Sequence, residues 1–198
     1  MNHPELIAVP ILMLADYTLT ILGAKSSAVV YRNHFTTPTY VLNPLWRKSV
    51  DQIRWFNPRH TLLVALVTVL LVVVDRAALP YDLFELPLGM LFGAFGAVCG
   101  RHLTSLLLFR YFNRHPNEIS GQVQLSLKLL LKISQYNYIG LIPIFTIIVV
   151  LVPNLYTGGV LLGLFALVLV HFVWAARAKP PEPSDDETVQ AELADTEA

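Results

Sequence analysis

Residues 84–109 read FELPLGMLFGAFGAVCGRHLTSLLLF, a long apolar stretch in which charged side chains are rare. An α-helix rises about 1.5 Å per residue and the hydrocarbon core of a bilayer is about 30 Å thick, so this stretch is long enough to cross it. Four other apolar stretches lie elsewhere in the sequence. We therefore predict five transmembrane helices, at about residues 5–24, 60–79, 84–109, 138–153 and 157–176.

The composition also indicates a membrane protein. Hydrophobic residues make up 55% of the chain, charged residues make up only 14%, and the mean hydropathy is +0.55. An ordinary soluble domain carries about a quarter charged residues. Because backbone polar groups in lipid must be satisfied within the protein, helices are favoured over open strands. We predict an all-α fold, a polytopic transmembrane helix bundle over residues 1–177. The lipid bilayer is the partner that we expect for this bundle.

The distribution of basic residues predicts how the chain threads the membrane. Twelve of the fourteen Lys and Arg residues fall in the segments that follow the first, third and fifth predicted spans, which lie on one side of the bilayer. Basic loops are enriched on the cytoplasmic side. We predict a bacterial or archaeal cytoplasmic membrane protein with its N-terminus outside and its C-terminus cytoplasmic. The sequence has no basic stripe interleaved with exposed aromatic residues, so nucleic-acid binding is not expected.

The segment after the first span carries a helix signal. Asn43-Pro44 resembles an N-cap followed by proline at the first helical position. Val50 and Ile53 follow Trp46 at four and seven positions, which places the three on one helical face. We predict a short amphipathic helix in the cytoplasmic interface. Its marker residues are Asn43, Pro44, Trp46, Arg47 and Lys48.

Residues 123–137 give two conflicting patterns. Apolar residues alternate from Val123 to Ile133 as they do in a strand, whereas Gln124, Lys128 and Lys132 recur every four residues as in a helix. Because an exposed strand edge is not tolerated in lipid, we predict a second amphipathic helix on the cytoplasmic side. Whether it is separate from the fourth span or continuous with it stays open.

The C-terminal residues, 178–198, differ from the rest of the chain. They hold seven acidic residues against Lys179 alone, together with several prolines. Such a segment cannot bury enough apolar surface to fold. We predict a disordered acidic tail on the cytoplasmic side.

Glycines recur within the third span. Gly89, Gly93, Gly96 and Gly100 are separated by four, three and four residues, which places them along one face of a helix. Small residues on one face allow another helix backbone to approach closely. The partner can be another helix of the bundle or a second copy of the chain, so a homo-oligomer through this face is one of the two interpretations.

Ionisable side chains lie inside three of the predicted spans, namely Asp16, Arg101, His102 and His171. Counting from the basic residues at the span ends places all four about 9–14 Å from the inner surface of the membrane. Ionisable groups in a span are costly and face a partner or a cavity. We therefore expect one polar layer across the bundle. Three further histidines, expected to be solvated at the cytoplasmic surface, are His34, His60 and His115.

Three hypotheses account for this polar layer. Asp16 and Arg101 can form a structural salt bridge that joins the first and third spans. Alternatively, Asp16, His102 and His171 can line a path for protons or ions. The same three residues can also bind a metal ion that activates water, although the neighbouring Arg101 repels a cation. We predict no resident metal or cofactor.

The function that we expect from the sequence is a membrane scaffold or accessory subunit that meets a cytoplasmic protein partner. The alternatives are a small transporter or proton-coupled subunit that uses Asp16, His102 and His171, and an intramembrane metal-dependent enzyme. The sequence contains no Ser-His-Asp, zinc-protease or dinucleotide motif, so an enzymatic function is the less expected one.

The N-terminal quarter carries two short motifs. Asp16 and Thr20 form an Asp-x-x-x-Thr motif in the first span, and Asn43-Pro44 follows downstream. In these motifs the chain resembles families of small prokaryotic polytopic membrane proteins. The resemblance implies a membrane location and brings no known activity.

Overall fold

The computed structural model describes residues 5–37, 39–43, 46–77 and 83–178. The predicted acidic tail, apart from Ala178, and Pro44 lie outside these residues. Five long helices are present in the described part of the chain, and each is long and apolar enough to cross a membrane. The predicted all-α bundle is therefore confirmed. The helices are α1 (Glu5–Ser27), α4 (Pro58–Arg76), α5 (Glu85–Arg114), α6 (Leu127–Leu151) and α7 (Leu155–Arg177).

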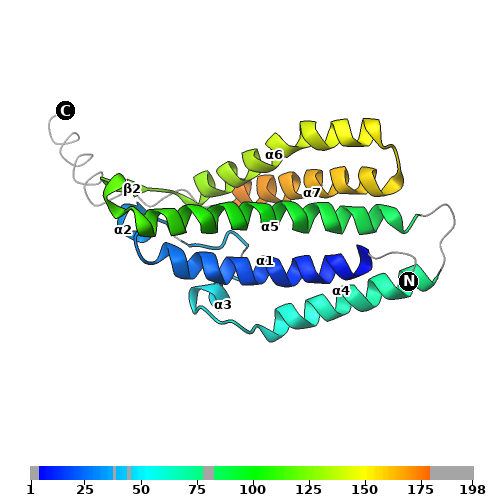
Figure 1. Ribbon diagram of the computed structural model, residues 1–198, viewed down its shortest axis with the longest axis horizontal. Coiled ribbons are helices and arrows are strands. Elements are labelled where there is room, and N and C mark those ends of the chain that lie inside the picture. The colour runs from blue at the N-terminus through cyan, green and yellow to red at the C-terminus, as the bar shows by residue number, and fades with distance from the viewer. Residues whose placement is uncertain (1–4, 38, 44–45, 78–82, 179–198) are drawn as a thin grey trace, which may run out of the picture.

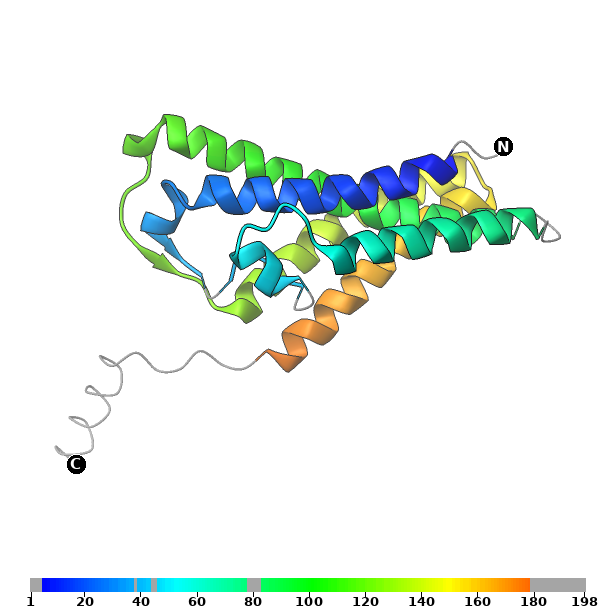
Figure 2. The same cartoon turned by 90° about the horizontal axis from the view of Figure 1, so that it is seen from below.

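The long helices pack as a row with α5 at its centre (Figure 1). α5 contacts α1 on one side and α7 on the other, while α4 covers α1 and α6 covers α7. In the view from below, α7 runs obliquely to α1 (Figure 2). The two helices that flank α5 therefore diverge, and that divergence positions the site described below.

Large apolar side chains cover the outside of the row. In α4, for example, Leu62 is 69% exposed, Leu66 is 62% exposed and Val73 is 58% exposed. An apolar surface this extensive is unfavourable in water and matches lipid. The surface of the bundle thus agrees with the composition in indicating a multi-pass membrane protein.

Polar side chains at the helix starts define where three of these helices begin. The Asn57 side chain accepts hydrogen bonds from the backbone N–H groups of the first turn of α4, and Ser126 caps α6 in the same way. Asn154 and Thr157 form a reciprocal capping box at the start of α7. Each cap satisfies backbone donors that have no partner within the helix.

The fourth span and the residues before it form one structure. α6 begins at Leu127 and continues without interruption to Leu151, so the predicted amphipathic helix is continuous with the span. The prediction of helix from residue 123 is wrong at its start. Val123–Gln124 is strand β2, which pairs in parallel with β1 (Phe35–Thr36). The Ser126 cap is the reason that the helix begins only after this strand.

The predicted interfacial helix is shorter than expected. α3 covers only Arg47–Asp51, with Trp46 as its N-cap residue, so the assignment of the N-cap to Asn43 is wrong. Val50 is fully buried in a cluster with α1, whereas Ile53 lies beyond the helix with a positive φ of 49°. Packing on α1 through Val50, rather than the local Asn-Pro signal, therefore determines this helix. Two other short helices, α2 (Tyr31–His34) and η2 (Pro116–Glu118), also lie outside the five long ones.

The four glycines of α5 fall into two groups. A methyl group at Gly89 or Gly93 would collide with the backbone of α7, at Tyr156 and Val160 respectively. Gly159 and Gly163 of α7 meet the backbone of α5 in the same close manner. Gly96 and Gly100, in contrast, have no such neighbour within 4 Å. Only the first half of the predicted stripe therefore supports a close helix approach, and its partner is α7.

Candidate functional site: a cavity with ionisable residues between the long helices

A cavity of about 260 Å³ lies where all five long helices approach one another. It is lined by every member of the predicted polar layer, and we call it the Asp16 cavity. α4 and α6 also contribute side chains, and the segment between α1 and α4 borders it through residues 41–43, 46 and 50. Its ionisable residues are Asp16 of α1, His60 of α4, Arg101 and His102 of α5, and His171 of α7.

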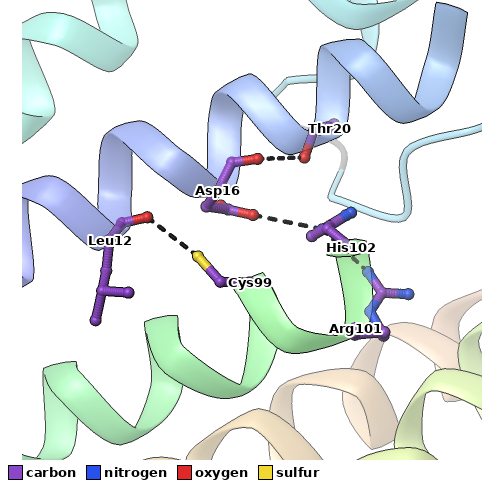
Figure 3. A network of polar contacts seen from close by, with 6 residues as sticks. All are labelled: Leu12, Asp16, Thr20, Cys99, Arg101 and His102. Atoms are coloured by element: carbon purple, nitrogen blue, oxygen red, sulfur yellow. Dashed lines mark hydrogen bonds and ion pairs between the residues drawn. The ribbon is translucent and has the colours of Figure 1, made fainter. Parts of the chain in front are cut away.

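Asp16 pairs with His102 and not with Arg101 (Figure 3). Nε2 of His102 lies 3.4 Å from Oδ1 of Asp16. Arg101 lies 3.3 Å from the same histidine nitrogen, and its guanidinium carbon is 6.0 Å from the centre of the Tyr138 ring. The expected salt bridge between Asp16 and Arg101 is therefore absent from the described residues. Adjacent residues on a helix point about 100° apart, so only one of the two α5 residues can face α1.

The Nε2 atom of His102 can serve only one of its two neighbours at a time. When this nitrogen carries a proton it can donate to Asp16, and when it is bare it can accept from Arg101. The carboxylate stabilises a charged imidazolium, and the guanidinium supplies a donor to a neutral ring. When Nδ1 carries a hydrogen in both cases, the two arrangements differ by one proton.

Two further contacts lie beside this pair, one that joins α1 to α5 and one within α1 (Figure 3). The Cys99 thiol donates to the Leu12 carbonyl at 3.2 Å, across the two helices. The Thr20 hydroxyl donates to the Asp16 backbone carbonyl at 2.8 Å, the usual bond of a threonine to the residue four positions before it. The threonine of the Asp-x-x-x-Thr motif thus bonds the helix backbone rather than the carboxylate.

His171 faces the same cavity from α7. Its Nδ1 lies 2.9 Å from the Leu167 carbonyl, so Nδ1 carries a hydrogen and Nε2 is left as an acceptor. The ring contacts Tyr138 and Trp174, with centroid distances of 5.1 and 5.4 Å. His171 is therefore held in place by its helix and by aromatic neighbours.

The metal hypothesis does not agree with this geometry. In the described ranges, no group of three His, Cys, Asp or Glu side chains is arranged to hold a metal ion. Asp16, His102 and His171 line one cavity but do not converge on one point. The described geometry therefore gives the metal hypothesis for these three residues no support.

Two hydroxyl groups of α6 belong to this region and were not predicted from the sequence. Ser134 and Tyr138 are each only 1% exposed, and neither hydroxyl has a hydrogen-bond partner within the described structure. Tyr138 lines the Asp16 cavity. The spacing of four residues, which places both hydroxyls on one face of an apolar helix, is the signal that could have found them.

His60 also lies in the site, contrary to the prediction of a solvated surface histidine. It is only 5% exposed and its ring stacks on Tyr17 at 4.8 Å. The Tyr17 hydroxyl in turn donates to the Arg54 carbonyl at 2.7 Å. Because Asn57 caps α4, the first turn of that helix is held against α1 and carries His60 inward.

No family model, curated protein or solved structure matches this chain. What the site does is therefore argued from its own geometry. That geometry combines a proton-accepting pair, a cation and the unpartnered Tyr138 hydroxyl around one cavity. These are groups that can bind water and transfer protons.

Proposed function

We propose that this protein is a multi-pass protein of a prokaryotic cytoplasmic membrane that moves protons, as a small transporter or proton-coupled subunit. The observation that carries the proposal is the Asp16 cavity, in which ionisable side chains of separate candidate spans surround one space. Ionisable residues inside membrane spans are costly, and they mark proton and ion pathways when they line a cavity.

The size and lining of the cavity favour this function over a scaffold. A structural polar layer needs only a dry ion pair, whereas this cavity measures about 260 Å³. One water molecule occupies about 30 Å³ of liquid, and polar groups hold water in cavities that are large enough. The unpartnered Tyr138 hydroxyl at its wall supplies such a group.

The proton step uses the two arrangements of His102. Nε2 takes a proton from a hydronium ion that enters the cavity, which leaves water behind, and the new N–H donates to Asp16. When the proton passes to the carboxylate, the electron pair of the N–H bond stays on Nε2, which then accepts from Arg101. Each state of His102 therefore has its own partner, which lowers the cost of changing between them.

The distribution of charge supports access from the cytoplasm. The segment between α1 and α4 borders the cavity, and it belongs to the basic side of the chain. The positive-inside rule places that side in the cytoplasm. A proton bound at Asp16 thus exchanges with the cytoplasmic solution.

Proton flux in reconstituted vesicles tests this function. The purified protein is placed in liposomes that contain a pH-sensitive dye, and a potassium gradient with valinomycin supplies the driving force. We expect flux above that of empty vesicles, and a decrease of roughly tenfold or more in Asp16→Asn and in His102→Gln, since each removes one proton-binding group.

His115→Gln is the matched control, because His115 lies exposed at the end of the same helix as His102. We expect this variant to keep the wild-type flux. A wild-type protein that is folded in the vesicles and conducts no more than empty vesicles would contradict proton movement and favour the scaffold role.

A further inference from the structure

Two more cavities lie close to the Asp16 cavity. One measures about 280 Å³, lies between α5, α6 and residues 31, 37, 39, 40 and 42, and is lined by the buried Ser134, so we call it the Ser134 cavity. The other measures about 310 Å³ and is lined by the exposed Arg32 and Asp51. We call it the Arg32 cavity. Because Arg32 and Asp51 are exposed and lie outside the candidate membrane spans, this cavity opens at the surface of the protein.

The three cavities share walls in a fixed order. Leu42, Arg101 and His102 line both the Asp16 cavity and the Ser134 cavity. Thr37, Thr39 and Tyr40 line both the Ser134 cavity and the Arg32 cavity. A residue that lines two cavities forms the partition between them. The series therefore runs from the surface, past Tyr40, past His102, to Asp16.

Unpartnered polar groups indicate that the inner cavities hold water. The Ser134 hydroxyl is buried at the wall of the Ser134 cavity and has no protein partner among the described residues. Arg101 lies at the partition, and its Nε also lacks a partner there. Buried polar groups are nearly always hydrogen-bonded, and water in an adjoining polar cavity supplies the missing partner.

The outer partition depends on a glycine of α1. Tyr40 lies against Gly23, where an added methyl group would collide with the tyrosine hydroxyl and lie 3.0 Å from Cζ. The Tyr40 ring also lies near the Phe109 ring, with 6.0 Å between the two centroids. Burial raises the pKa of Tyr40 to about 12, so this residue is neutral at physiological pH. Tyr40 is thus an uncharged side chain whose ring fits against the surface that Gly23 leaves open on α1.

We infer that the three cavities form one hydrated route for water and protons from the surface to Asp16, with Tyr40 as its outer gate and His102 at its inner partition. The role of this route in proton movement rests on the proposed function, whereas the presence of the hydrated route does not. Its occupants are small, since Tyr40 and His102 separate the cavities.

Cysteine labelling tests the route. In a Cys99→Ala background, Ser134→Cys is compared with Ser27→Cys, because both serines are 1% exposed and only Ser134 lines one of the three cavities. The full-length protein in liposomes is treated with methanethiosulfonate ethylammonium and followed by mass spectrometry. We expect Ser134→Cys to react roughly tenfold faster or more, because Ser27 is reached only by local unfolding.

Two substitutions test the gate. Tyr40→Ala removes the partition and Gly23→Ala pushes the ring away from α1. Because the closed gate limits access, each should increase the labelling rate of Ser134→Cys about threefold or more. Tyr40→Phe keeps the ring and should leave the rate unchanged. If Tyr40→Ala does not fold, Gly23→Ala alone answers the question. Equal rates for Ser134→Cys and Ser27→Cys, or no response to displacement of Tyr40, would overturn the route.

The labelling experiment and the flux experiment distinguish failure of the route from failure of the proposed proton function. Fast labelling of Ser134→Cys without proton flux supports the route and removes the proton function. Proton flux with Ser134→Cys as slow as Ser27→Cys overturns the route and keeps the function, since protons would then reach Asp16 by another path.

Discussion

The two halves of α5 differ in how they meet their neighbours. In the first half, Gly89 and Gly93 let the backbones of α5 and α7 touch. In the second half, Gly100 has no neighbour within 4 Å and the next residues, Arg101 and His102, face cavities. One helix thus supplies both a closely packed interface and a polar cavity. We call these regions the glycine interface and the cavity region.

This difference suggests a division of roles along the bundle. Close packing at the glycine interface fixes how α5 and α7 are joined, because backbone atoms cannot yield to a larger side chain. The divergence of α7 from α1 then leaves space beyond it (Figure 2). Stability should therefore depend mainly on the glycine interface, whereas function should depend on the cavity region.

Substitution at the glycine interface should have the largest effect. Gly93→Ala places a methyl group 2.8 Å from the Cα of Val160, so the two helices must separate. We expect the free energy of unfolding to fall by about 2 kcal/mol or more, as is typical of overpacked sites. Denaturant unfolding in mixed micelles, followed by circular dichroism, measures the change.

Gly96→Ala is the control for that experiment, because its methyl group meets nothing within 4 Å and lies only one turn away. Alanine should stabilise the helix there by up to about 1 kcal/mol. A loss of stability at Gly96 equal to that at Gly93 would mean that both halves of α5 are equally close-packed, and the comparison would be wrong.

The pairing of Asp16 in the cavity region should give a smaller effect. A double-mutant cycle of Asp16→Asn and His102→Gln should yield a coupling free energy of about 1 to 2 kcal/mol, because the two side chains are in contact. The matching cycle of Asp16→Asn with Arg101→Gln should yield less, since Arg101 contacts the histidine and acts on Asp16 only through its charge at longer range. The same unfolding assay measures both cycles. A larger coupling free energy for Asp16 with Arg101 than for Asp16 with His102 would instead support the salt bridge that the sequence suggested.

The sequence predicted well where the long apolar helices lie and that the four polar residues share one layer, for a physical reason. Apolar length and the rise per residue determine where a helix crosses lipid and how deep each side chain lies. Position along the membrane normal therefore accounts for the five predicted spans. It also accounts for the shared cavity of four polar residues, namely Asp16, Arg101, His102 and His171.

The rotation of a helix about its own axis, which decides which side chains face which neighbour, cannot be predicted from apolar length and rise per residue. Asp16 faces His102 rather than Arg101, and only half of the glycine stripe faces α7. Both outcomes depend on how α5 is turned between α1 and α7, which only the packing of all the helices decides. The start of α3 and the burial of His60 were missed for a similar reason, since each depends on contacts with α1.

Two tyrosines that line the Asp16 cavity provide the finest comparison, between a hydroxyl bonded to protein and one available to water. Tyr17 donates to the Arg54 carbonyl at 2.7 Å, whereas the buried Tyr138 hydroxyl has no partner in the described structure. Tyr17→Phe should lower the free energy of unfolding by about 1 kcal/mol, because it leaves a carbonyl without its donor. Tyr138→Phe should change it by less than about 0.5 kcal/mol, since a water molecule loses only one of several bonds. Thermal unfolding of the two variants under the same conditions measures the difference. An equal loss in both would mean that Tyr138 bonds to protein, and the hydration of the Asp16 cavity would lose one of its supports.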